Sequence, residues 1–208
     1  MGNKNKSTLM KDAIILFVIT LLAGLGLGLV YEVTKNPIAE ANAKAKQEAY
    51  QRVYPDAKEF AADEAIDKKV EDSAQFLSDN ALDGAVISEV LVANDESGNA
   101  IGYVVSFVAK EGYGGDISLS MGMTNEGEIT GLEVLSASET AGLGANCTKP
   151  DFKDQFKGKN VDAIEYTKDG ATADNQIDAI SGATITTKAV TKGVNAAIAF
   201  LKQNVMQG

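Results

Sequence analysis

The residues best suited to chemistry lie near the carboxyl end of this 208-residue chain, in segment 178–188, which reads DAISGATITTK. The segment gathers four hydroxyl side chains, a glycine and a lysine where a loop is expected to turn into the last helix. Free backbone N–H groups and the helix dipole make such a helix N-terminus favourable for an anion, which predicts a phosphate-binding site. Ordinary capping is the alternative, because serine and threonine are preferred N-cap residues and Thr186 or Thr187 could serve as one. There is no Walker pattern, so a P-loop site is not supported.

Composition excludes several other kinds of chemistry. The chain contains no histidine, which rules out Ser-His and Cys-His catalysis and histidine-ligated zinc or haem. Its single cysteine, Cys147, cannot hold an iron–sulfur cluster alone, and we expect it to be a small buried hydrophobic side chain. Any redox chemistry must therefore reside on an organic cofactor.

Three motifs occur along the chain: GYGGDI at residues 112–117, ETAGLG at 139–144 and DAISGAT at 178–184. In this order they resemble the glycine-rich strand entry, the Glu-Thr-Pro-Gly-Leu-Gly loop and the flavinylation motif of one family. That family is the FMN-binding domain of the RnfG and NqrC subunits of ion-translocating electron-transport complexes. The sequence departs from it at Ala141, where proline is common, and at Ala137, where many members have histidine. The resemblance covers roughly residues 85–205, and the single apolar span and the chain length are closer to RnfG than to the longer NqrC.

The resemblance implies a covalent flavin site. In the family, a flavin transferase moves FMN from FAD onto the last threonine of the motif, which corresponds to a phosphoester bond on Thr184 here. The resemblance also implies that Glu139, Thr140 and Leu143 contact the flavin. Tyr113 could stack nearby or be only a core or rim aromatic, and Lys188 could balance the phosphate charge or remain solvated. The implied cofactor-binding residues are Tyr113, Gly114, Glu139, Thr140, Gly142, Leu143, Gly144, Asp178, Ser181, Gly182, Ala183, Ile185, Thr186 and Lys188.

The implied function is an electron relay within a membrane complex that couples electron flow between ferredoxin and NAD to Na+ or H+ translocation. The chain has no nicotinamide fingerprint and no cluster ligands, so other membrane and peripheral subunits of the Rnf complex must bind substrates and move ions. One alternative is an NqrC-type subunit or a free-standing extracytoplasmic FMN protein. A more distant alternative is an anchored binding or structural domain in which the threonines only cap a helix.

The N-terminal apolar run, residues 13–31, contains 19 residues without a charge. As a helix it would span about 28 Å, close to the ~30 Å hydrocarbon core of a bilayer. A cleaved signal peptide is the alternative, but its apolar region is usually only about 7–15 residues long. Lys4, Lys6 and Lys11 precede the run, so the positive-inside rule predicts a cytoplasmic N-terminus and an extracytoplasmic FMN domain at the cell membrane.

The remainder of the chain is acidic. The formal net charge is −10, and setting aside the three lysines and one aspartate before residue 30 leaves 16 basic against 28 acidic side chains. Such a surface repels nucleic acid, so we expect no nucleic-acid partner.

The order of hydrophobic patterns predicts an α+β fold, in which an N-terminal transmembrane helix is followed by an antiparallel sheet packed against helices. A helix is expected to start at Asn36-Pro37 and to end at Tyr54-Pro55. Strands are expected at 86–93, 101–109, 117–124 and 129–136, paired as two hairpins, with a further strand at 161–166. Helices are expected at 150–157 and over the last 20 residues, with short helices in 56–83. The predicted organisation is a cytoplasmic N-terminus (1–12), a transmembrane helix (13–31), a helical connector (32–84) and an FMN-binding domain (85–208).

Overall fold

The computed structural model of the chain describes residues 3–207. Its contacts divide the chain into two units, Met1–Ala45 and Lys46–Gly208. The division falls within a long first helix, so the last turns of this helix belong to the second unit.

Helix α1 (Asn3–Val53) contains the apolar run and is continuous. An 18-residue window within it has a mean hydropathy of 2.7 and no buried residue, so the helix is long and apolar enough to cross a membrane. The predicted helix start at Asn36-Pro37 is wrong, because Pro37 lies inside α1. An interior proline costs about 3 kcal/mol, but the apolar span before it and the Ala-, Lys- and Glu-rich sequence after it both favour helix. The predicted end is confirmed at Val53.

A single antiparallel sheet in the order β1-β2-β3-β4-β5 forms the centre of the second unit. Its strands are β1 (Glu59–Ala61), β2 (Ala85–Asn94), β3 (Ala100–Gly112), β4 (Gly115–Thr124) and β5 (Ile129–Ser136). The four strands predicted from the sequence are confirmed, as are both hairpins. The turns of these hairpins contain Gly98 and Gly127 with φ of +80° and +88°, a backbone conformation that favours glycine.

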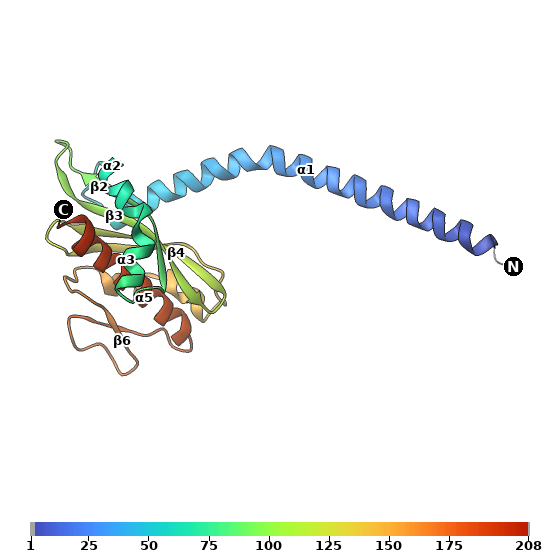
Figure 1. Cartoon of the computed structure of the whole chain (residues 1–208). Coiled ribbons are helices and arrows are strands. Elements are labelled where there is room, and N and C mark those ends of the chain that lie inside the picture. Colours follow the sequence, from blue (N-terminus) through green and yellow to red (C-terminus); the bar gives the residue numbers. More distant parts are fainter. Residues whose placement is uncertain (1–2, 208) are drawn as a thin grey trace. The chain divides into compact units, whose positions relative to one another are not determined.

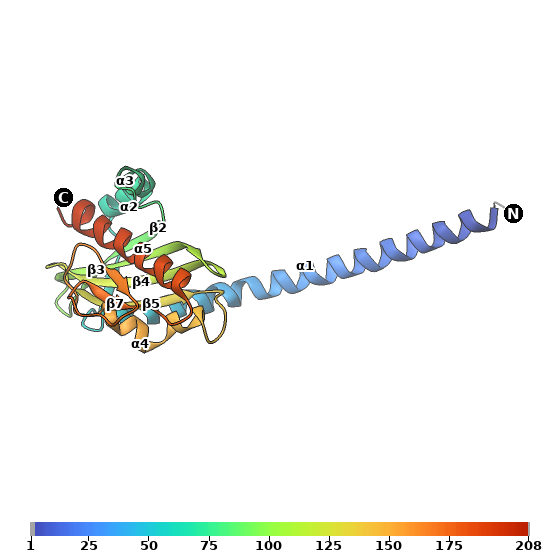
Figure 2. The same ribbon diagram turned by 90° about the horizontal axis from the view of Figure 1, so that it is seen from below.

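Helix α5 (Thr184–Phe200) packs across one face of this sheet (Figures 1 and 2). It confirms the predicted C-terminal helix and continues into a π-helical turn, η3 (Leu201–Val205). A Cβ added at Gly193 would lie 2.8 Å from Ala109 Cβ, so the helix backbone lies directly on β3. The main buried side chains between helix and sheet are Val105, Phe107, Ile117, Leu119, Met121, Met123, Val190, Val194 and Ile198.

Two short helices, α2 (Glu64–Glu71) and α3 (Ser73–Asp79), cover the carboxyl end of α5. The rings of Phe76 and Phe200 meet edge to face with centroids 5.7 Å apart. The Lys69 ammonium donates a hydrogen bond to the Asn204 carbonyl (2.8 Å). The short helices predicted in residues 56–83 are therefore confirmed, while β1, which precedes them, was not predicted.

The opposite face of the sheet receives the last two turns of α1, from Lys46 onward (Figure 2). Tyr50, Val53 and Tyr54 pack there against Val104, while the next residue along β3, Val105, faces α5. The contact is close because two strand residues are glycines. A Cβ at position 122 would lie 2.5 Å from the Val53 carbonyl oxygen, and one at position 131 would lie 3.0 Å from Val53 Cα.

Short elements connect β5 to α5: η1 (Gly144–Thr148), α4 (Pro150–Lys153), η2 (Asp154–Phe156), β6 (Glu165–Thr167) and β7 (Gln176–Asp178), the last two paired in parallel. The predicted helix at 150–157 is thus divided into an α-helical and a 3-10 turn. The predicted strand at 161–166 starts only at residue 165. The Asn195 side chain of α5 accepts a hydrogen bond from Ile164 N and donates one to Ile164 O, so both backbone groups are unavailable to a strand.

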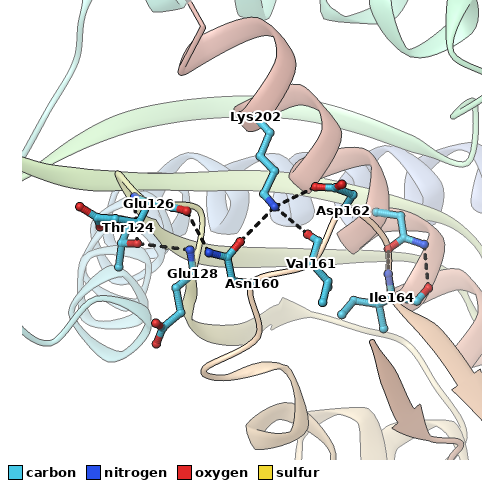
Figure 3. Close-up of polar contacts among 9 residues, drawn as sticks. Thr124, Glu126, Glu128, Asn160, Val161, Asp162, Ile164 and Lys202 are labelled. Carbon is cyan, nitrogen blue, oxygen red and sulfur yellow. Dashed lines mark hydrogen bonds and ion pairs between the residues drawn. The ribbon is translucent and has the colours of Figure 1, made fainter. Parts of the chain in front are cut away.

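Lys202 connects the end of the chain to two surface segments (Figure 3). Its ammonium donates hydrogen bonds to Asn160 Oδ1 (3.2 Å) and to the Val161 carbonyl (3.0 Å), and it pairs with Asp162 (3.0 Å). Asn160 in turn donates to the Glu126 carbonyl (3.0 Å), in the turn between β4 and β5. These contacts hold the carboxyl end of the helical segment in place, at the end remote from Thr184.

Candidate functional site

A pocket of about 440 Å³ lies at the N-terminal end of α5. Three segments that are distant in sequence form it: the turn between β3 and β4, the loop after β5, and the loop that leads into α5. These are the segments that contain the three sequence motifs. The lining residues are Tyr113, Glu139, Thr140, Leu143, Gly144, Gly182, Ala183, Thr184, Ile185 and Thr186. Each of them is among the residues that the family resemblance implied.

The first turn of α5 has no side-chain cap. The helix begins at Thr184, and the N-cap residue Ala183 makes no capping hydrogen bond. Thr186 and Thr187 do not cap the helix either. The Thr186 hydroxyl donates to Glu139 (2.8 Å), while the Thr187 hydroxyl donates to the Ala183 carbonyl and accepts from Ile180 N (both 3.0 Å). The capping alternative is therefore wrong for these two threonines, and the first N–H groups of α5 can hold an anion.

Thr184 is half-buried at the pocket wall, at the first position of the helix. The residue two positions earlier, Gly182, has φ +73°, in the left-handed region that favours glycine. A Cβ there would lie 3.0 Å from Leu143 Cδ2, on the opposite wall. The glycine thus permits both the sharp turn into the helix and the close approach of two walls.

Exposed apolar side chains are concentrated around the pocket. Tyr113, Leu143 and Ile185 are 70%, 45% and 53% exposed, although all three are large and hydrophobic. Within residues 46–207, Val86 is the one other large hydrophobic side chain exposed to this degree. Apolar surface gathered around a hollow is typical of a ligand-binding site.

These features fit FMN. The apolar rim suits a flat aromatic ring, and the uncapped helix end suits a phosphate. The pocket volume is within the ~300–1,000 Å³ usual for small-molecule sites. The described residues contain no group of three or more His, Cys, Asp or Glu side chains placed to hold a metal ion.

Five of the residues implied by the resemblance do not line the pocket: Gly114, Gly142, Asp178, Ser181 and Lys188. Gly114 and Gly142 lie in two of the segments that form it. Asp178 and Ser181 are exposed, and Asp178 instead accepts a hydrogen bond from Ala171 N (2.6 Å). Lys188 is also exposed, and it borders a separate hollow beside β6.

Cys147 is fully buried behind the pocket loop, as expected from the sequence. Burial, with a smaller contribution from the nearby Glu139 charge, raises the pKa of its thiol to about 11. The side chain is therefore a neutral thiol near pH 7, and it is part of the hydrophobic core.

Fold and pocket together define an FMN-binding domain, and the family model described as "FMN-binding domain" matches residues 112–199. The G subunit of the Na(+)-translocating ferredoxin:NAD(+) oxidoreductase complex of Acetobacterium woodii is 36% identical over 190 residues, which are 90% of this chain and 89% of that protein. The chain belongs to the family of these G subunits. The G subunit of the proton-translocating complex of Clostridium ljungdahlii is 45% identical over 51% of this chain and 56% of that protein. A solved structure, the C subunit of the Na(+)-translocating NADH-quinone reductase of Parabacteroides distasonis, is 29% identical with a TM-score of 0.46, over 54% of this chain and 60% of that one.

Proposed function

We propose that this chain carries FMN as a phosphoester on the Thr184 hydroxyl and relays electrons as the G subunit of an ion-translocating ferredoxin:NAD+ oxidoreductase complex. The observation that carries the proposal is the position of Thr184. The residue is half-buried and lies at the uncapped start of α5, on the wall of a pocket with an apolar rim. The relatives from A. woodii and C. ljungdahlii are both named as G subunits of such complexes, which supports the assignment of the partners.

The side chains and backbone of this chain would divide the work of holding the cofactor. The first N–H groups of α5 would stabilise the phosphate charge. Tyr113, Leu143 and Ile185 line the pocket and would cover the flavin with apolar surface and exclude water from it. When bound, FMN supplies the electron-transfer chemistry that none of the amino-acid side chains can provide. The ester fixes the cofactor without using the ring itself.

Attachment requires a maturation enzyme, which we propose to be a flavin transferase that uses FAD. The Thr184 oxygen loses its proton and forms a bond to the flavin-side phosphorus, the pyrophosphate bond of FAD breaks, and AMP leaves. No electrons are transferred in this step. Asp178 and Ser181 are exposed beside the pocket, so their side chains are accessible to the transferase.

We also propose a topology, in which α1 crosses the membrane once. The lysines at positions 4, 6 and 11 keep the N-terminus in the cytoplasm, and the FMN domain lies outside. The other subunits of the complex bind ferredoxin and NAD and translocate the ion.

The test is flavin fluorescence after denaturation. The chain, produced together with a flavin transferase, is run on a denaturing gel under ultraviolet light, and its peptides are weighed by mass spectrometry. We expect fluorescence in the wild-type chain and a Thr184 peptide heavier by one FMN less one water. Thr184→Val should abolish both signals, whereas Thr172→Val, which removes an exposed hydroxyl outside the pocket, should leave them unchanged. An unmodified Thr184 in the wild-type chain contradicts the proposal.

A further inference from the structure

One carboxylate connects the three segments that form the pocket. Glu139 belongs to the loop after β5, which also supplies Thr140 and Leu143. Its Oε1 accepts a hydrogen bond from the backbone N–H of Gly114 (3.1 Å), in the turn between β3 and β4. Its Oε2 accepts one from the hydroxyl of Thr186 (2.8 Å), in the first turn of α5. The two partners lie 25 and 47 residues from Glu139 along the chain.

Glycines make the space that this carboxylate occupies. A Cβ at Gly144 would lie 2.1 Å from Glu139 Oε2 and 2.6 Å from the Thr186 hydroxyl oxygen. A Cβ at Gly112 would lie 2.7 Å from Glu139 Oε1. Real Cβ contacts are not this short, so a larger residue at either position would displace the carboxylate. The backbone around Glu139 is thus shaped to accept this side chain.

Both hydrogen bonds fix parts of the pocket that the cofactor needs. Gly114 is adjacent to Tyr113, one of the exposed side chains of the rim. Thr186 is 1% exposed and turns inward, and its bond to Glu139 sets the rotation of the helix turn that presents Thr184. The Glu139 carboxylate therefore sets the position of Tyr113 relative to the Thr184 hydroxyl.

We infer that Glu139 is a positioning residue for flavinylation, whose carboxylate joins the Tyr113 turn to the Thr184 turn and so holds the pocket in the form that receives the flavin. The inference rests on the proposed attachment of FMN to Thr184. In the wild type both carboxylate oxygens accept, one from Gly114 N–H and one from the Thr186 hydroxyl. A glutamine can keep its oxygen toward Gly114 N–H, but its NH2 group would then have to donate to the Thr186 hydroxyl, so both contacts lose the carboxylate charge and the second reverses its direction.

Three substitutions examine this arrangement in the full-length chain. Glu139→Gln keeps the shape and removes one acceptor, Thr186→Val keeps the shape and removes one donor, and Thr186→Ser restores the hydroxyl. A hydrogen bond to a charged group typically contributes a factor of about 10 to 100 in equilibrium terms. We therefore expect flavinylation by transferase and FAD to be at least about tenfold slower in Glu139→Gln and Thr186→Val. The double variant should be no slower than the worse single one, because both remove the same contact.

The measurements are the rate of flavin incorporation, followed on denaturing gels, and the visible circular dichroism of the attached flavin once modification is complete. The dichroism reports how rigidly the ring is held, and a change in global stability alone does not alter it well below the unfolding temperature. Thr186→Ser should match the wild type in both. Glu128→Gln, the same chemical change at an exposed turn, is the matched control and should also match it. Gly144→Ala keeps every hydrogen-bonding group but displaces the Glu139 carboxylate. It should therefore slow flavin incorporation as Glu139→Gln does, and it provides a second measurement if Glu139→Gln folds poorly.

Two results overturn the inference, and they are distinguishable. If the wild-type chain gains no flavin at Thr184, the proposed function fails and the role of Glu139 fails with it. If the wild-type chain is modified but Glu139→Gln and Thr186→Val keep its rate and its dichroism, the function stands and the positioning role alone is refuted.

Discussion

Replacing Gly122 by alanine should loosen the attachment of α1 to the sheet. The added Cβ would lie 2.3 Å from the Thr130 hydroxyl oxygen and 2.5 Å from the Val53 carbonyl oxygen. Because the second of these atoms belongs to the backbone, it cannot move away by a change of rotamer. Overpacking of this kind costs about 1–3 kcal/mol. The methyl group would also disrupt the hydrogen bond from the Thr130 hydroxyl to the Val53 carbonyl, worth about 1 kcal/mol.

The total loss is therefore about 2–4 kcal/mol, which for a domain of this size lowers Tm by roughly 10 °C. Thermal and urea unfolding of the full chain in detergent can be followed by tyrosine fluorescence, since Tyr50 and Tyr54 are buried at this contact and the chain has no tryptophan.

Two other glycines provide graded controls for this prediction. Gly131→Ala, whose Cβ would be 3.0 Å from Val53 Cα, should cost about 1 kcal/mol or less. Gly28→Ala, with no atom within 4 Å of its Cβ, should have no effect on this transition. Equal stability of the 122 and 131 variants, or a loss below about 0.5 kcal/mol for both, would show that α1 does not lie this close to the sheet.

Other parts of the structure give further expected outcomes. Tyr113→Ala should leave the flavin attached to Thr184 but expose the ring, so iodide should quench its fluorescence several-fold more efficiently than in the wild type; unchanged quenching would place Tyr113 away from the cofactor. Cys147 should resist iodoacetamide at pH 7 in the folded chain and react once denaturant unfolds it, because the thiol is buried and its pKa is raised to about 11. Since the pKa of the unfolded thiol is near 9.0, its contribution to folding stability is complete below pH 9 and is lost as the pH rises through about 11. A stability curve of Cys147→Ala that falls as steeply as the wild type between these two values would contradict the assignment.

The strands and the last helix could be predicted because their periods are visible in the sequence. Strand β5 has the predicted bounds of Ile129–Ser136, and α5 presents apolar residues at three- and four-residue spacing toward β3. The sequence-based predictions were wrong or incomplete where the structure depends on contacts between residues that are far apart in the sequence or on long flanking segments. Strand β1 has only three residues, too few to show alternation, and it forms because residues 92–94 of β2 pair with it. Pro37 signals a helix start locally, but the long helical segments on both sides of it prevail.

The location of the candidate site was predictable because its three motifs are each continuous in sequence. Their convergence supports the pattern-based interpretation of residues 178–184. The roles of individual side chains were less accessible, since they depend on distances across the fold. Nothing in the spacing from Glu139 to Gly114 or to Thr186 indicates that one carboxylate contacts both. Likewise, the sequence does not indicate that Asp178, at the end of β7, and Lys188, in α5, are exposed and do not line the pocket.

The attachment of α1 to the sheet has a practical consequence for anyone who wants this protein free of lipid. Residues 46–54 supply Tyr50, Val53 and Tyr54 to a core cluster. Helix α1 therefore cannot be removed completely without removing part of the core. A shortened version that starts at Lys46 keeps this cluster and should fold as a domain that needs no detergent. A version that starts at β2 would expose Ala93 and Val104 to solvent, because the residues of α1 that cover them would be missing. Such a version should aggregate or be degraded.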